Sequence, residues 1–298
     1  MPSIQSNGLT LEYEILGPAD GPPLLLVMGL GMQMIAWPDA FCARLVDKGF
    51  RVIRFDNRDV GLSTKLDQLG TPNVPLEFIK HMMRIPLKAP YFINDMATDA
   101  AALLDALGIE RAHVVGASLG GMIAQNLAAN FPDKVASLTS IMSTTGRRSL
   151  PGPTRKARNA VLQVPARRGD IEGAVSRMKS VLRAIGSPGF PEDETILNLF
   201  CERHVRRNYH PPGAARQLIA IAASGDRTKA VRRITAPTLV IHGKDDPLVP
   251  VACGIETSRE IPNAKLSVIA GMGHDLPTSL HERLADEIAA HCLQQPQS

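Results

Sequence analysis

The sequence is poor in cysteine and aromatic residues, and it has no long hydrophobic run. Its four cysteines, Cys42, Cys201, Cys253 and Cys292, lie far apart, without the CxxC or Cys/His spacing of zinc and redox sites. The longest early apolar stretch, residues 24–28, is too short for a signal-peptide core or a membrane span. We therefore expect no metal site and no membrane partner, and we predict a cytoplasmic location.

The glycine motifs that bind phosphates and dinucleotides are also missing. The chain contains neither a P-loop nor GxGxxG, so we predict no cofactor and expect the side chains themselves to carry any chemistry. Its 298 residues are 44% hydrophobic and 21% charged, which is typical of a globular protein and excludes disorder. With 24 glycines and 23 prolines in no repeating pattern, collagen-like and low-complexity structures are excluded too.

The charge is small overall but unevenly distributed. There are 33 Lys/Arg against 29 Asp/Glu, yet residues 144–233 alone hold 18 basic and 7 acidic side chains. The basic residues are spread over many turns with few aromatics between them, unlike a nucleic-acid-binding surface, so we predict no nucleic-acid partner. We interpret the segment as a solvated basic insertion that favours neutral or anionic substrates by electrostatic steering.

Short apolar strands alternate with helical patterns on both sides of this insertion. Such alternation is typical of an α/β protein, with a mostly parallel sheet and helices on both faces. The residues predict strands at 9–13, 24–28, 51–55, 113–116, 237–243 and 265–269, and helices at 41–47, 94–107, 122–130, 252–260 and from about 280.

The middle of the chain has a different composition. From about residue 144 it is rich in proline, glycine and arginine, with helical fragments at 171–185 and 194–207 and no buried-strand run. Each flanking half carries only part of a parallel sheet. We therefore predict one sheet domain, residues 1–143 and 234–298, interrupted by a helical cap, residues 144–233.

The strongest chemical signal is Gly116-x-Ser118-x-Gly120, which lies after a predicted strand and before a predicted helix. A serine on such a tight turn adopts strained backbone angles and needs glycines two residues before and after it. The turn exposes the hydroxyl and aims the first helical amides, including that of Leu119, at an oxygen that becomes negative in acyl transfer. The alternative is a glycine turn that only packs a helix close to a strand.

A serine nucleophile needs a base, and His274 is the best candidate. It lies in a glycine-rich loop directly after the strand 265–269, at the sheet edge where ligands bind, and it follows the serine in the chain. We interpret His242 and His113 as turn or core residues. The other histidines, His81, His204, His210, His281 and His291, lie in no supporting motif.

The base in turn needs a carboxylate that holds it in one tautomer. Asp245 and Asp246 follow the strand 237–243 directly. We favour Asp246, because Pro247 restricts it to extended backbone angles, whereas Asp245 is free to be solvated or to pair with Lys244. We interpret Asp275, next to His274, as a local loop cap.

Ser118, Asp246 and His274, in this chain order and on this strand–helix pattern, resemble the α/β-hydrolase superfamily. Residues 26–29 (LVMG), 37–39 (WPD), 54–64 (RFDNRDVGLST) and 271–277 (GMGHDLP) are similar to its aclacinomycin methylesterase branch, whose members cleave a methyl ester from an aromatic polyketide. The resemblance does not extend convincingly to residues 144–233. It implies the α/β-hydrolase fold with a cap that shapes substrate choice.

The resemblance also implies a site for the oxyanion. It makes the backbone amide of Leu30 one donor and that of Leu119 the other, although Met28 precedes Gly29 where many relatives have His-Gly. A backbone donor survives this change of side chain. Gly29 and Trp37 are the implied substrate-binding residues, with a plain core role equally open for Trp37.

Together these features predict a cofactor-free serine carboxylic-ester hydrolase that forms an acyl-enzyme with small to medium esters. A lactonase, a carbon–carbon bond hydrolase and a perhydrolase share the triad and stay open, as does a non-catalytic small-molecule receptor. Chemistry that needs an aspartate nucleophile is disfavoured by Ser118. We expect a small-molecule ester as the partner, with a homodimer as an open alternative to a monomer.

Overall fold

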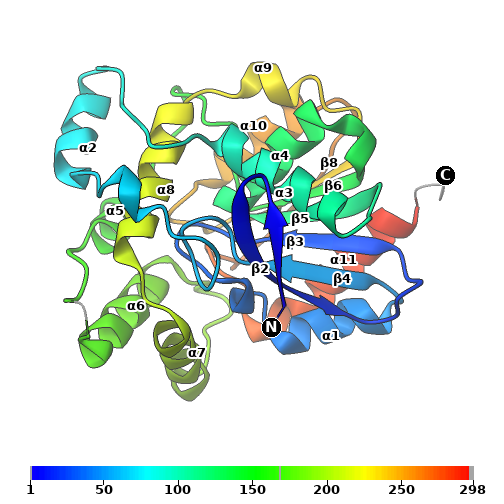
Figure 1. Ribbon diagram of the computed structural model, residues 1–298, viewed down its shortest axis with the longest axis horizontal. Helices are drawn as coiled ribbons and strands as arrows, with labels where there is room; N and C mark the ends of the chain where they lie inside the picture. Colours follow the sequence, from blue (N-terminus) through cyan, green and yellow to red (C-terminus); the bar gives the residue numbers. More distant parts are fainter. Residues whose placement is uncertain (1, 168, 295–298) are drawn as a thin grey trace.

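The computed structural model describes residues 2–167 and 169–294, and its centre is a twisted eight-stranded sheet. The strand order is β1-β2-β4-β3-β5-β6-β7-β8; β1 and β2 run antiparallel to their neighbours, and the other pairs are parallel (Figure 1). The strands are β1 Ser3–Ser6, β2 Leu9–Leu16, β3 Pro23–Val27, β4 Arg51–Phe55, β5 Ala112–Ala117, β6 Val135–Ile141, β7 Thr238–Gly243 and β8 Lys265–Ile269. The predicted α/β class is confirmed.

Strand β3 is apolar along its whole length because both of its faces are covered. On β3, Leu24 and Leu26 pack into one core and Leu25 and Val27 into the other. Helices α3, α4 and α10 cover one face of the sheet, and α1 and α11 the other (Figure 1). Their bounds are α1 Asp39–Asp47, α3 Ile93–Ala106, α4 Leu119–Asn130, α10 Val251–Glu260 and α11 His281–Leu293.

Strand β6 is the main element that the sequence patterns did not predict. Its sequence, VASLTSI, places Ser137, Thr139 and Ser140 at buried positions. A strand with this many hydroxyl groups does not look like a buried one, although β-branched and small residues fit well between two parallel neighbours. β6 lies between β5 and β7 and so joins the two predicted halves of the sheet.

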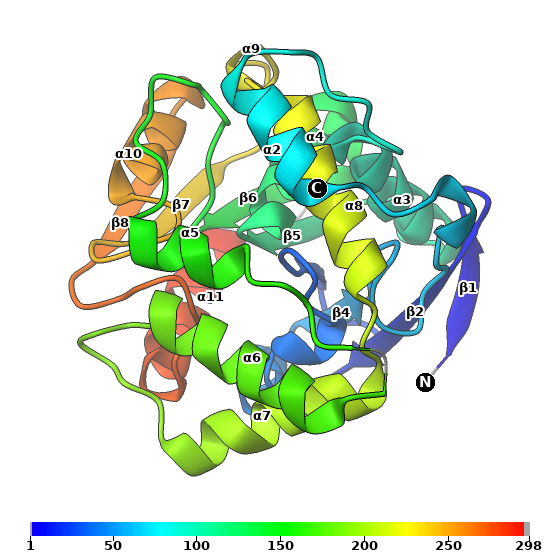
Figure 2. The ribbon, with the colours of Figure 1, turned by 90° about the vertical axis from the view of Figure 1, so that its left-hand side faces the viewer.

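Helices α5 to α8 form a layer over the end of the sheet at which β5 ends (Figure 2), and Ser118 follows β5 directly. They are α5 Arg155–Val161, α6 Ile171–Ile185, α7 Glu194–Arg207 and α8 Pro211–Ser224. Within the predicted cap range, α9 Thr228–Val231 packs instead on α4 and α10 of the sheet domain. Outside that range, α2 Val74–Met82 lies against α8.

Several arginines of the insertion are paired with acids of the sheet domain rather than solvated. Arg216 is fully buried and binds Asp59, at 2.7 Å, while Arg207 binds Asp56, also at 2.7 Å. Although burial alone would raise it, hydrogen bonding to Arg216 holds the pKa of Asp59 below its usual value. The expected solvated basic surface is therefore partly wrong, because much of the excess charge is neutralised against the acidic sheet domain.

Candidate active site

Ser118 lies at a strained turn between β5 and α4. Its φ of 56° and ψ of −118° are angles that a residue with a side chain rarely adopts. The turn is crowded: a Cβ on Gly116 would lie 2.2 Å from the carbonyl oxygen of Gly120, and one on Gly120 would lie 2.0 Å from that of Val27. Only glycine fits at either position, which is the physical reason for the spacing seen in the sequence.

The structure brings together the three side chains that the sequence singled out. His274 Nε2 lies 2.9 Å from Ser118 Oγ, and His274 Nδ1 lies 2.7 Å from Asp246 Oδ2. When Nδ1–H donates to the carboxylate, Nε2 carries the lone pair that accepts the serine proton. Ser118 is half-buried and the other two are buried, so the chain of hydrogen bonds is largely shielded from water.

Asp246 is held in place by its own loop. Its Oδ1 accepts hydrogen bonds from the backbone amides of Leu248 and Val249, both at 2.8 Å, which leaves Oδ2 for His274. Asp245 is exposed, and its Oδ2 accepts from the amide of Gly271 at 2.7 Å, so it stabilises the loop that carries the histidine. The two acids therefore have separate structural roles.

The loop that carries His274 is fixed by the end of α6 and the residues that follow it. The backbone amide of His274 donates to the carbonyl of Ile185, at 2.8 Å, at the end of α6. Ser187 accepts from the amide of Gly273, at 2.8 Å, and donates to Asp275. Burial raises the pKa of the Asp275 carboxyl. Asp275 thus ties the loop to the segment that follows α6, and it does not cap its own loop as the sequence suggested.

The loop after β3 places Gly29 against the serine. A Cβ on Gly29 would lie 3.2 Å from Ser118 Cβ and 3.7 Å from Ser118 Oγ. Leu30 is the next residue, so its backbone amide belongs to the chain segment that contacts the serine. In residues 2–167 and 169–294, no hydrogen-bond acceptor is found for the backbone amide of Leu30 or of Leu119. Leu119 is the first residue of α4, where such an amide has no partner within the helix.

Two side chains that sequence reasoning missed hold this loop. Gln217, on α8, accepts from the amide of Gly31 at 2.8 Å, and Asn57 donates to the carbonyl of Met28 at 2.9 Å. Asn57 lies in the segment that carries the family resemblance and could have been considered there. Gln217 lies in the insertion, where no motif marks it.

A family model described as "alpha/beta hydrolase fold" matches residues 22–172. The chain belongs to the α/β-hydrolase family. Rhodomycin D methylesterase DauP of Streptomyces sp. (strain C5) is 31% identical to it, with 97% of this chain and 96% of the relative covered. Rhodomycin D methylesterase DnrP of Streptomyces peucetius has the same identity and coverage. The resemblance to the aclacinomycin methylesterase branch is thereby confirmed.

Solved structures agree on the fold of this α/β hydrolase. A thermophilic esterase from Thermogutta terrifontis superposes with a TM-score of 0.69 at 24% identity, with 98% of both chains covered. At this identity the similarity supports the fold alone. The expectation of an ester-hydrolysing enzyme agrees with the methylesterase relatives.

Trp37 belongs to the core of this α/β hydrolase. It is fully buried, and its ring stacks on Phe41 with the centroids 5.7 Å apart. These surroundings support a packing role for Trp37 rather than a substrate-binding role. His113 and His242 are likewise buried: His113 Nδ1 lies 2.8 Å from Ser137 Oγ, and His242 Nε2 lies 2.7 Å from the carbonyl of Val249.

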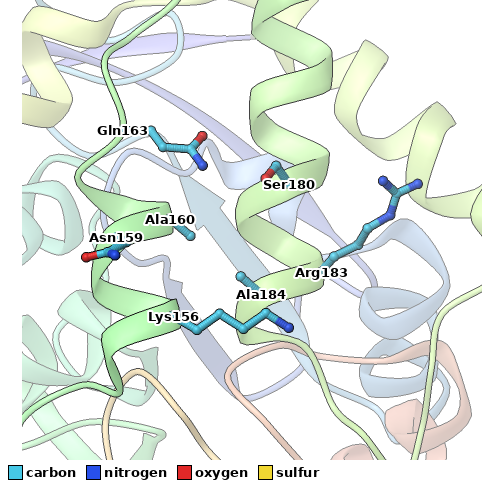
Figure 3. A pocket seen from close by; sticks show the side chains of 7 residues that line it. All are labelled: Lys156, Asn159, Ala160, Gln163, Ser180, Arg183 and Ala184. Carbon is cyan, nitrogen blue, oxygen red and sulfur yellow. The ribbon is translucent and has the colours of Figure 1, made fainter.

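A groove of about 430 Å³ between α5 and α6 is separate from the triad. Figure 3 shows its polar lining, with Lys156 and Gln163 from the α5 side and Ser180 and Arg183 from α6. None of the predicted catalytic residues lines it, so we assign it no part in the chemistry.

The part of the chain that the structure describes shows neither a metal-binding cluster nor a membrane-spanning helix. Within residues 2–167 and 169–294, no group of three or more His, Cys, Asp or Glu side chains is arranged to hold a metal ion. In the same ranges, no helix has the length and apolar character needed to cross a bilayer.

Proposed function

We propose that this α/β hydrolase cleaves carboxylic esters, with Ser118 as nucleophile, His274 as general base and acid, and Asp246 as the acid that orients the imidazole. The observation that carries the proposal is the unbroken hydrogen-bonded chain from hydroxyl to imidazole to carboxylate, at 2.9 and 2.7 Å. The strained turn at Ser118 supports it, since such strain is retained where a side chain must be presented in one direction.

The first half of the reaction forms an acyl-enzyme. Ser118 Oγ attacks the carbonyl carbon of the ester while its proton passes to His274 Nε2, and Asp246 stabilises the resulting imidazolium. The backbone amides of Leu30 and Leu119 donate hydrogen bonds to the negative oxygen of the tetrahedral intermediate. His274 then gives the proton to the leaving alcohol oxygen as the ester C–O bond breaks.

The second half restores the enzyme. His274 Nε2 removes a proton from a water molecule, whose oxygen attacks the acyl carbon and forms a second tetrahedral intermediate. When this intermediate collapses, the bond to Ser118 breaks, the carboxylic acid leaves, and the proton on His274 returns to Ser118 Oγ. The balance is one water consumed and one acid and one alcohol released.

The substrate class is a small to medium ester. Because two of the relatives are rhodomycin D methylesterases, a methyl ester is the form to test first. The roles proposed for Gly29 and for residues 144–233 are to shape the pocket beside the nucleophile. A cytoplasmic location, and a homodimer as the alternative to a monomer, belong to this proposal as well.

The test compares Ser118→Ala with Ser180→Ala, which changes an exposed serine on α6. On a short-chain nitrophenyl ester, Ser118→Ala should lower kcat by about four to six powers of ten, because the triad acts as a unit. Ser180→Ala should behave as the parent enzyme. Near-normal hydrolysis by Ser118→Ala contradicts the mechanism.

Two further measurements separate the alternatives. A receptor should be labelled by a fluorophosphonate at Ser118 but turn over esters hardly at all, whereas an esterase should show steady turnover of the unlabelled protein. A panel of esters, lactones and carbon–carbon bond substrates then distinguishes the reactions that share the triad.

A further inference from the structure

Helix α2, Val74–Met82, is amphipathic, but its apolar side chains are exposed and its charged side chains face the protein. Its apolar side chains face solvent: Ile79 is 54% exposed, Met82 68% and Met83, just beyond its end, 66%. Its charged side chains are the shielded ones, because the side chains of Glu77 and Lys80 are only 12% and 34% exposed. A helix on the surface of a globular protein normally has the opposite orientation.

The exposed apolar surface extends along one continuous segment. Leu76, Phe78 and Ile85 are also between 38% and 46% exposed, so six large apolar side chains within ten residues face outward. Exposed patches of this kind mark places where a protein meets a partner or an apolar phase. The helix lies against α8; Figure 1 shows it at the left-hand edge of the molecule, and in Figure 2 it lies in the foreground, on the side that faces the viewer.

The charges around the helix indicate which partner it meets. Residues 74–88 contain Lys80, Arg84 and Lys88 but only one acid, Glu77, whose Oε1 lies 2.6 Å from Lys80 Nζ. Arg84 and Lys88 are exposed, and neither has an ion-pair partner within residues 2–167 and 169–294. An apolar face beside free basic side chains is complementary to an anionic lipid surface.

We propose that α2 is a membrane-surface anchor, whose apolar face lies in the headgroup region of an anionic bilayer. Met82, Met83 and Ile79 enter the acyl boundary, and Arg84 and Lys88 contact lipid phosphates. A two-fold contact between two copies of the chain is less well matched, because it would bring the same net positive segment of each copy together. Contact of this kind needs no membrane-spanning helix, so the proposal replaces the expectation of no membrane partner, which was drawn from the lack of a long apolar run. It is independent of the proposed ester hydrolysis.

The proposal is tested by sedimentation of the purified protein with vesicles. The protein should bind vesicles that contain phosphatidylglycerol and bind poorly to pure phosphatidylcholine, with binding that weakens as salt is added. The double variant Met82→Ser/Met83→Ser should lose binding, and single Met82→Ser should lose part of it. Leu199→Ser, at a 61% exposed position on α7, is the matched control and should bind like the parent.

The electrostatic part is tested separately. Arg84→Gln and Lys88→Gln should each weaken binding about five-fold, the effect of one basic residue near an anionic surface. Every variant should hydrolyse a soluble nitrophenyl ester at the parent rate, which separates failure of the anchor from failure of the proposed function.

Three results would overturn the proposal. The first is a parent protein that does not bind anionic vesicles at low salt. The second is a double variant that binds like the parent. The third is a parent dimer in solution that dissociates in the double variant, because the apolar face would then be a contact between copies.

Discussion

Replacing Gln217 by leucine tests whether the cap helps to hold the proposed oxyanion loop. The side chain is fully buried; its Oε1 accepts from the amide of Gly31 at 2.8 Å, and its Nε2 donates to the carbonyl of Arg58 at 2.9 Å. Leucine has a similar size but leaves both backbone groups without this partner. Each buried group that loses its hydrogen bond costs about 1–3 kcal/mol of folding free energy.

The expected effect on kcat depends on the backbone amide of Leu30, the proposed oxyanion donor, which is next to Gly31 in the chain. Loss of one oxyanion donor lowers kcat by about two to three powers of ten. In Gln217→Leu the loop keeps its second support, the hydrogen bond from Asn57 to the carbonyl of Met28. We therefore expect kcat to fall about 10- to 100-fold, with KM little changed, since the contact proposed for Leu30 is made chiefly in the transition state.

The assay needs a control for instability alone. Gln125→Leu, on α4, also replaces a fully buried glutamine, one that donates its hydrogen bond to Ser140 Oγ on β6, at 3.0 Å, and not to the loop. Urea unfolding should show both variants less stable than the parent, and steady-state kinetics should show the large fall in kcat only for Gln217→Leu. A folded Gln217→Leu protein with the parent kcat would refute the reasoning.

Three other predictions concern the turn at Gly120, the acid Asp246 and the buried His113. Gly120→Ala should fail to fold or lose hydrolysis, because the new Cβ would lie 2.0 Å from the carbonyl oxygen of Val27; circular dichroism and ester turnover check this, and a folded, active variant contradicts it. Asp246→Asn should lower kcat by about four powers of ten, whereas Asp245→Asn should change it by less than about ten-fold, and comparable losses would argue for the other acid. Burial lowers the pKa of His113 to about 4, below its unfolded value near 6.5. Its contribution to stability is therefore complete above pH 6.5 and is lost as the pH falls toward 4, by at most about 3 kcal/mol. Urea unfolding between pH 7.5 and 4.5 should give a shallower pH dependence for His113→Asn than for the parent, and an identical slope would count against this assignment.

Sequence patterns predicted the structure correctly where the local backbone admits only a few types of residue. A tight turn with a side chain at its tip excludes all but glycine at 116 and 120, so the spacing, together with the strand before it and the helix after it, predicted the turn at Ser118. The same holds for the end of α3, where Gly108 adopts a φ of 66° directly after the helix. Strand β3, a buried run of continuous apolar residues, was predicted for the same reason.

Patterns failed where the partner is distant in sequence. The buried pair of Arg216 and Asp59 is formed between residues 157 positions apart, and nothing local distinguishes Arg216 from a solvated arginine. Gln217 is similar, because its role depends on where α8 lies relative to Gly31. The inverted orientation of α2 cannot be read from its sequence either, since amphipathicity gives the two faces of a helix but not the one that meets the protein.

The buried ion pairs between the insertion and the loop after β4 limit how new specificities are obtained. A chimaera that receives a foreign cap without Arg216 would leave Asp59 as an isolated charge in the interior, and breaking a buried pair from one side costs about 3–5 kcal/mol. Cap transplantation therefore has to carry the arginines at 207 and 216 along with it. We therefore expect variants with changed pocket residues that keep these two ion pairs to fold more often than variants in which residues 144–233 are exchanged as a whole.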